Sequence, residues 1–166
     1  MATGPRYAVR FRRSREGRTS YKQRLRLLKS NLPRLIIRKS NKHIFVQIVV
    51  FEPKGDKVVA QAKSSELKKL GWKYSTKNIP AAYLTGMLIA KKALTAKVPE
   101  AIADIGFYTA TKGAKIFAVV KGAADAGLKI NYDAKVFPSE DRIAGKHIKN
   151  ASGLPQDFEA IRQKMK

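Results

Sequence analysis

The sequence predicts an α/β protein in which helices cover a mixed sheet and a basic arm precedes it. Three segments rich in β-branched and aromatic residues follow one another between residues 34 and 62, and stretches with helical periodicity come after them. Short polar turns separate the three segments, which is the pattern of an antiparallel meander. With 166 residues and 44% hydrophobic content, the chain is long enough for one globular domain with extensions.

The first 31 residues are expected to form a basic arm that ends in a short helix. Residues 1–18 show no apolar periodicity, so we expect them to be extended. A Ser-x-x-Gln pattern at Ser20 predicts the start of a helix. Tyr21, Leu25 and Leu28 share one face of that helix, and an asparagine and a proline shortly after it would end it.

Three strands are predicted next, at Arg34 to Ser40, His43 to Phe51 and Asp56 to Ala62. The short polar connection 40–42 has the length of a hairpin turn, and the turn 53–56 contains proline and glycine. The meander is therefore expected to be antiparallel throughout.

Helices dominate the second half of the core. Ser64 or Ser65 is expected to cap a short helix that Gly71 ends. Asn78 opens a longer helix that closes at the Val98-Pro99 pair.

A short buried strand is predicted at Ala101 to Phe107, and a crossover helix before it favours a parallel neighbour in the sheet. The stretch Gly113 to Gly127 is compatible with a strand or a helix; helical spacing of its apolar residues favours the helix. Residues after Asp133 are expected to be irregular, with a short helix from Pro155 to Met165. We accordingly divide the chain into an arm (1–31), an α/β core (32–131) and a C-terminal extension (132–166).

Positive charge is concentrated at the N-terminus. Ten of the twelve arginines lie between Arg6 and Arg38, and the first 43 residues hold 14 Lys+Arg against the single acid Glu16, a net +13 of the chain's +23. Residues 44–122 add +8 and residues 123–166 only +2. Arginine binds phosphate through a planar fork and stacks on bases, so this arm is predicted to bind RNA. The candidate RNA-binding residues of the arm and its helix are Arg6, Tyr7, Arg10, Arg12, Arg13, Arg15, Arg18, Tyr21, Lys22, Arg24, Arg26 and Lys29.

A second candidate group lies at the turn between the first two strands. Three cations on a rigid hairpin tip suit phosphates, and short polar side chains beside them can donate to sugar or base edges. The alternative is an ordinary solvated turn, and we expect Asn41 to serve the turn by adopting a positive φ. The residues of this group are Arg38, Lys39, Ser40, Asn41, Lys42 and His43.

Composition excludes several other classes of protein. The chain has no cysteine, no apolar run that could span a bilayer and no apolar core of a secretory signal, so we expect no membrane partner and a cytoplasmic location. A mitochondrial transit peptide is the weaker interpretation of the arm, because the basic pattern continues into the first strand. Trp72 fits either base stacking or the core, with the core favoured.

No catalytic constellation is visible, so we expect no enzyme activity, no cofactor and no metal. The two histidines, His43 and His147, lack partners at useful spacing, and no phosphate-binding glycine loop occurs. The order of elements also fits nucleases of the ribonuclease H type, which need clustered carboxylates to hold two metal ions. Here Asp104 stands alone on its strand, and we interpret it as a turn or cap residue.

Several blocks of the chain resemble the large-subunit ribosomal protein family eighteen, the binders of 5S ribosomal RNA, in its archaeal and eukaryotic branch. The most specific block is Arg34 to Ile44 (RLIIRKSNKHI). Supporting blocks, in chain order, are MATGPR at Met1, YKQRLRLLKS at Tyr21, NIPAAYLTG at Asn78, DIG at Asp104, FAVVKGAADAGL at Phe117 and DRIAG at Asp141.

This resemblance implies a structural protein in the central protuberance of the large ribosomal subunit. Such a protein clamps 5S rRNA and links it to the large rRNA through its N-terminal arm, beside neighbouring ribosomal proteins. The resemblance also implies a ribonuclease H-like core without catalytic residues. The chain is short after Ile148 and lacks the basic extension of eukaryotic members, so we expect an archaeal-type protein. A metal-dependent nuclease and a DNA-compacting protein are the alternatives to test.

Overall fold

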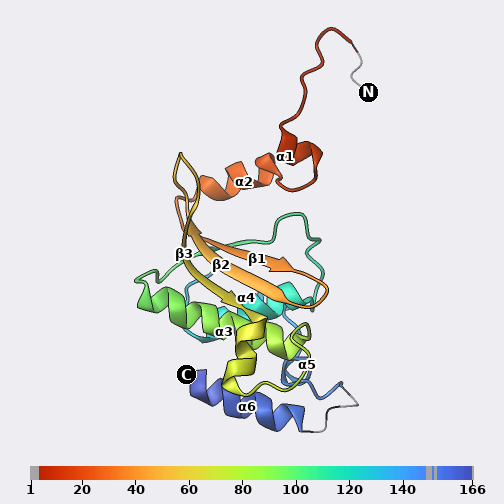
Figure 1. Cartoon of the computed structure of the whole chain (residues 1–166), viewed down its shortest axis with the longest axis vertical. Coiled ribbons are helices and arrows are strands. Elements are labelled where there is room, and N and C mark those ends of the chain that lie inside the picture. The colour runs from red at the N-terminus through yellow and green to blue at the C-terminus, as the bar shows by residue number, and fades with distance from the viewer. Residues whose placement is uncertain (1–3, 149–150, 152, 166) are drawn as a thin grey trace.

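A four-stranded mixed sheet lies at the centre of the fold (Figure 1). The computed structural model describes residues 4–148, 151 and 153–165. Residues 1–3 of the predicted arm, with the first letters of the MATGPR block, and residues 149, 150, 152 and 166 of the predicted extension lie outside the described residues. The strands are β1 (Arg34–Lys39), β2 (Ile44–Val50), β3 (Lys57–Lys63) and β4 (Ile102–Asp104), in the order β3-β2-β1-β4.

The strand pairing follows the sequence pattern. β1 pairs antiparallel with β2, and β2 with β3, so the predicted meander is confirmed. β4 pairs parallel with β1, as expected after a crossover. β4 is shorter than the predicted strand, because the chain turns away after Asp104 and reaches a positive φ at Gly106.

Alternation along the strands gives the sheet two different faces. On β1, Leu35 and Ile37 are fully buried beneath the sheet, whereas Arg34, Ile36 and Arg38 point to the outer face. The inner face is apolar and forms the core, and the outer face carries charged and polar side chains.

Two long helices cover the inner face: α3 (Ile79–Thr95) and α4 (Lys115–Asp125). The Asn78 side chain accepts a hydrogen bond from the Ala81 N–H at 2.9 Å, so the predicted cap is confirmed. The helical interpretation of the ambiguous stretch is also confirmed. The helices cross closely at Gly86 and Gly122, where a Cβ on either residue would overlap the backbone of the other helix.

A 3-10 helix, η1 (Ser64–Leu70), links β3 to the loop before α3 and ends at Gly71 with φ 100°. The prediction that Ser64 or Ser65 caps it is wrong, because the cap position is Lys63. The Ser64 hydroxyl instead accepts the Ile44 N–H at 3.0 Å, at the start of β2. Trp72 follows and belongs to the core, with 2% of its surface exposed.

The C-terminal segment adds further helices to the same core. They are the one-turn η2 (Ala134–Val136), α5 (Glu140–Ala144) and α6 (Leu154–Met165). α6 confirms the predicted C-terminal helix and lies beneath α3 (Figure 1), where the Phe158 ring is 5.6 Å from the Tyr83 ring. α5 was missed because five residues are too few to show a period.

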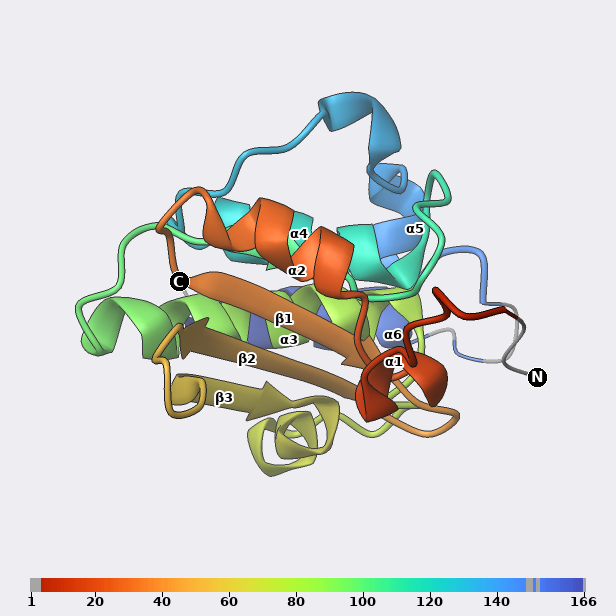
Figure 2. The same ribbon diagram turned by 90° about the horizontal axis from the view of Figure 1, so that it is seen from above.

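The N-terminal helices lie on the opposite side of the sheet. Figure 2 looks onto the outer face: α2 (Tyr21–Leu28) crosses it on the side of β1, and β2 and β3 remain in view. A short helix, α1 (Arg12–Arg15), precedes α2, so residues 1–18 are not entirely extended as expected. The Phe11 carbonyl accepts the Ser14 and Arg15 N–H groups, and a turn at Gly17 leads into α2.

Candidate nucleic-acid interface

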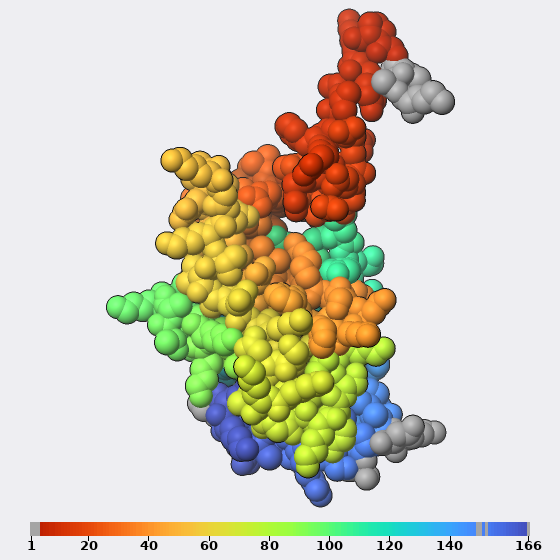
Figure 3. All heavy atoms as spheres, in the orientation of Figure 1, coloured from red at the N-terminus to blue at the C-terminus, as the bar shows by residue number. Residues whose placement is uncertain are grey.

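The arm presents its predicted RNA-binding residues to solvent. Figure 3 shows it standing out from the body of the molecule. Two of its aromatic rings are largely uncovered, with 50% of Tyr7 and 72% of Phe11 exposed. Glu16 contacts Arg12 at 3.6 Å and Arg18 at 3.1 Å, both on the surface, where such pairs contribute little stability. The exposed cations of the arm are Arg6, Arg10, Arg12, Arg13, Arg15 and Arg18.

Helix α2 is oriented differently from the expectation. The Ser20 hydroxyl accepts the Gln23 N–H at 3.4 Å, which confirms the predicted start. Tyr21 and Leu25 do not form a buried face, because both are exposed and the Tyr21 ring packs against Phe11 at 5.1 Å. The half-buried side of the helix carries Arg24, Leu27 and Leu28. Three predicted contact residues, Lys22, Arg26 and Lys29, are exposed.

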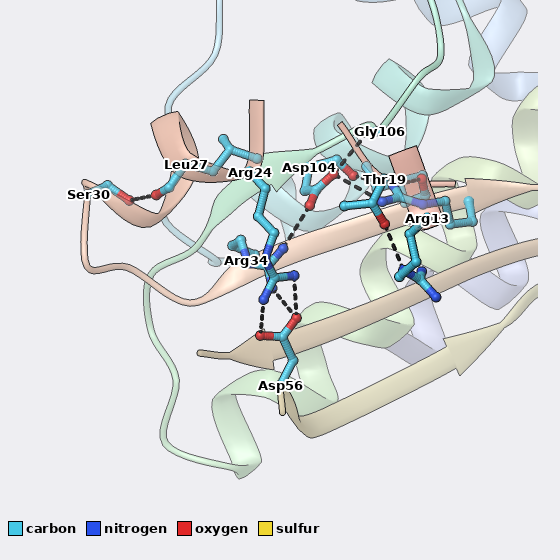
Figure 4. A network of polar contacts seen from close by, with 11 residues as sticks. Arg13, Thr19, Arg24, Leu27, Ser30, Arg34, Asp56, Asp104 and Gly106 are labelled. Carbon is cyan, nitrogen blue, oxygen red and sulfur yellow. Dashed lines mark hydrogen bonds and ion pairs between the residues drawn. The ribbon is translucent and has the colours of Figure 1, made fainter. Parts of the chain in front are cut away.

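An ion-pair network attaches α2 to the sheet (Figure 4). The Arg24 guanidinium donates to both carboxylate oxygens of Asp56, at 2.7 and 2.8 Å. Arg34 also donates to Asp56 and reaches Asp104 Oδ2 at 3.0 Å. Arg38 completes the network by donating to Asp104 Oδ1 at 3.1 Å and to the Asp104 carbonyl at 2.8 Å.

This network changes the interpretation of several residues. Arg24 and Arg38, both predicted to contact RNA, are engaged by carboxylates of the same chain. Asp104 accepts the Gly106 N–H at 2.9 Å, which fits the expected turn role, but its main partners are Arg34 and Arg38. Arg34 and Asp56 were missed, because their pairing is visible only in the folded sheet.

The charge state of Asp56 follows from its partners. Burial raises the pKa of this carboxyl, but hydrogen bonds from Arg24 and Arg34 outweigh burial and hold the pKa below its ordinary value. Asp56 is therefore ionised at neutral pH and neutralises the arginines beside it. The net charge offered to a ligand comes from the exposed cations around the network.

The hairpin tip contains residues that close the turn and residues whose side chains are exposed. The Ser40 hydroxyl accepts the His43 N–H at 2.9 Å and donates to the His43 carbonyl, so it closes the turn. His43 Nδ1 lies 3.1 Å from the Thr76 hydroxyl. The expected positive φ at Asn41 is wrong, because Ser40 shapes the turn and the non-glycine residues with positive φ in the described chain are Asn31 and Lys97. Lys39, Asn41 and Lys42 remain exposed at the tip.

Two further cations extend the tip toward α4. Partial burial lowers the pKa of the Lys115 ammonium, and the nearby charges of Lys77 and Lys39 lower it further. Mutual repulsion of this kind indicates a surface that favours an anion. Lys77 and Lys115 were missed because they lie 38 and 76 positions beyond Lys39 in the sequence.

The carboxylates at this surface, Asp56 and Asp104, bind arginines. No group of three histidine, cysteine, aspartate or glutamate side chains within residues 4–148, 151 and 153–165 is arranged to hold a metal ion. Both oxygens of Asp104, the acid that a nuclease would need, are bound by arginines. In the same residues, no helix is both long and apolar enough to cross a membrane.

Comparisons with known proteins point in one direction. A family model described as "Ribosomal large subunit proteins 60S L5, and 50S L18" matches residues 5–99 and 95–133. Similar curated proteins, each named "Large ribosomal subunit protein uL18", come from three archaea. The protein of Methanoregula boonei is 54% identical over 148 residues, covering 89% of this chain and 85% of its own. The protein of Korarchaeum cryptofilum is 51% identical over 148 residues, covering 89% of this chain and 76% of its own. The protein of Natronomonas pharaonis is 47% identical over 180 residues, covering 99% of this chain and 98% of its own.

Proposed function

Because this chain belongs to the family of ribosomal large-subunit proteins L5 and L18, we propose that it binds 5S rRNA and links it to the large rRNA in the central protuberance. Membership makes it a structural protein of the large ribosomal subunit and not an enzyme. Its place is the cytoplasmic ribosome, and the archaeal relatives agree with the expected archaeal type. Neighbouring large-subunit proteins are further proposed partners.

The observation that carries this proposal is the set of exposed cations on the arm, on α2 and at the hairpin tip. Six arginines are exposed on the arm, α2 adds Lys22, Arg26 and Lys29, and the tip adds Lys39 and Lys42, with Lys115 exposed nearby. The first 43 residues hold a net +13, which is unfavourable unless a polyanion neutralises it. Exposed arginines and aromatic rings in the arm suit both phosphates and unstacked bases.

The inner and outer cations have different tasks. Arg24, Arg34 and Arg38 are paired with Asp56 and Asp104, so they fix the geometry of α2 and the sheet. The exposed cations of the arm, α2 and the tip are the ones that neutralise RNA phosphates. The predicted residues therefore remain the proposed surface, with Arg24 and Arg38 acting mainly as supports.

Salt-dependent binding to 5S rRNA tests the proposal. The logarithm of the affinity should fall linearly with that of the salt concentration, by about 0.7 per neutralised phosphate on single strands. Deleting residues 1–18 should reduce both affinity and slope, while circular dichroism shows the core still folded. Affinity for 5S rRNA that barely changes with salt, or equal affinity for duplex DNA at fixed salt, would contradict the proposal.

A further inference from the structure

A pocket of about 490 Å³ lies between α2 and the outer face of the sheet. α2 contributes no fully buried residue to the fold, so the helix does not fill the space beneath it. The Arg24–Asp56 pair holds the helix at one end of this space, and the Arg13 guanidinium, bound to the Thr19 hydroxyl at 3.0 Å, lies at the other (Figure 4). The volume is within the range of roughly 300–1,000 Å³ that small-ligand sites occupy.

The floor of the pocket combines apolar and polar side chains with arginines that are paired with carboxylates. Ile36 and Gln47 are paired across β1 and β2 and both line the pocket, which places an amide beside an aliphatic side chain. Beside them, Asp56 and Asp104 line the pocket and bind Arg24, Arg34 and Arg38, so the guanidinium groups of the floor already have carboxylate partners and are not free to bind an entering anion.

The rim is strongly positive. Arg13, Arg18 and Arg26 line the pocket from the arm and α2, and all three are exposed. A ligand that fits must therefore carry its negative charge at the mouth and a neutral, hydrogen-bonding group inside. A nucleotide has this division, with phosphates at one end and a planar base at the other. An acidic peptide does not, because its carboxylates stand at the tips of the side chains that would enter.

We propose that this pocket accepts the unstacked base of one unpaired nucleotide of the bound RNA. The base lies on Ile36 with its edge toward the Gln47 amide, and the flanking phosphates contact Arg13, Arg18 and Arg26. The ligand is a nucleotide within an RNA strand and not a free one, because the arm and α2 carry further exposed cations outside the pocket, among them Arg10, Arg15, Lys22 and Lys29. The inference rests on the proposed RNA-binding function and adds a specific subsite to it.

The chain offers a matched pair of variants for the test. Gln47 and Gln61 are direct partners across β2 and β3 on the same face, but only Gln47 lines the pocket. Gln47→Trp fills the pocket and changes no arginine or carboxylate, whereas Gln61→Trp places the same ring beside it. We expect Gln47→Trp to weaken 5S rRNA binding about tenfold or more, because a stacked base is lost, and Gln61→Trp to stay within about twofold. Thermal unfolding checks that both variants are folded.

A crosslink on the unchanged protein provides a second measurement. Unmodified 5S rRNA irradiated at 254 nm, at which every base absorbs, should crosslink at one dominant nucleotide to the peptide that contains Ile36 or Gln47, and millimolar AMP should not displace the RNA. Equal losses in both variants, or no crosslink in the pocket from RNA that binds tightly, would overturn the pocket and leave the proposed function intact. Displacement by AMP would overturn the assignment to RNA. Failure of the unchanged protein to bind 5S rRNA would instead overturn the proposed function.

Discussion

At the scale of single residues, Asp56 carries the attachment of α2 to the sheet. It accepts hydrogen bonds from Arg24 on the helix and from Arg34 on β1. We expect Asp56→Asn to lower the free energy of unfolding by about 2 kcal/mol, since two arginines lose their counter-charge in a partly buried site. Backbone amides of α2 should also exchange faster with deuterium. Glu52→Gln, an exposed change in the loop between β2 and β3, is the control and should alter neither quantity.

The same carboxylate predicts a dependence on pH. Arg24 and Arg34 hold the folded pKa of Asp56 below its unfolded value, so its contribution is fully present above the ordinary aspartate range near ~3.9 and is lost as pH falls through the lower folded pKa. The difference in unfolding free energy between the wild type and Asp56→Asn should thus be constant from pH 7 to about 5 and shrink in more acidic urea titrations. A difference that vanished already at pH 6 would contradict this assignment.

Lys115 tests the cation cluster beyond the hairpin tip. Partial burial and the charges of Lys77 and Lys39 lower its pKa, so a bound polyanion should raise the pKa toward the ordinary value. Lys77→Gln should raise it in the free protein as well, whereas Lys68→Gln, an exposed change on η1, should not. An NMR titration of the lysine side chains measures the Lys115 pKa in the RNA-bound protein and in both variants. An unchanged Lys115 pKa on adding RNA would remove this lysine from the interface.

At the scale of elements, predictability depended on whether the signal was local. The meander, α3 and α4 were predicted because strand alternation, helical spacing and caps such as Asn78 act within a few residues. α1 and α5 are too short to show a period, and the nature of η1 depends on Ser64 bonding to a distant strand. The cations of the candidate site could be predicted because they are concentrated in one part of the sequence. The network between Arg34 and Asp104 was not, because its partners are 70 residues apart.

The crossing of α3 and α4 makes an element-scale prediction that opposes helix propensity. Gly→Ala within a helix normally stabilises it by up to about 1 kcal/mol. At Gly122 and Gly86 the new methyl group would overlap the backbone of the facing helix, so we expect each change to destabilise the protein by about 1–3 kcal/mol or more. Urea unfolding measures this, and Ala124→Gly on the half-exposed side of α4 shows the propensity effect alone. A stabilising Gly122→Ala would mean that the helices are farther apart.

At the scale of the whole molecule, positive charge is separated from the buried core. The core and the C-terminal helices lie beneath the sheet, while α1, α2 and the arm lie above it (Figure 1). The net charge falls from +13 in residues 1–43 to +2 in residues 123–166. In the proposed function one face of the molecule binds the polyanion, and the opposite face supplies the stability that keeps α2 and the hairpin in place.

The arm allows charge to be separated from arginine chemistry. Replacing Arg6, Arg10, Arg12, Arg13, Arg15 and Arg18 with lysine keeps the net charge but removes the planar fork and its stacking. Since the salt dependence counts neutralised phosphates, we expect the same slope as in the wild type. The affinity at fixed salt should nevertheless fall about tenfold or more. The corresponding glutamine variant should lose both affinity and slope, so it is the control for charge. A lysine variant that binds 5S rRNA as tightly as the wild type would show that the arm acts as charge alone, because only the geometry of its contacts has changed.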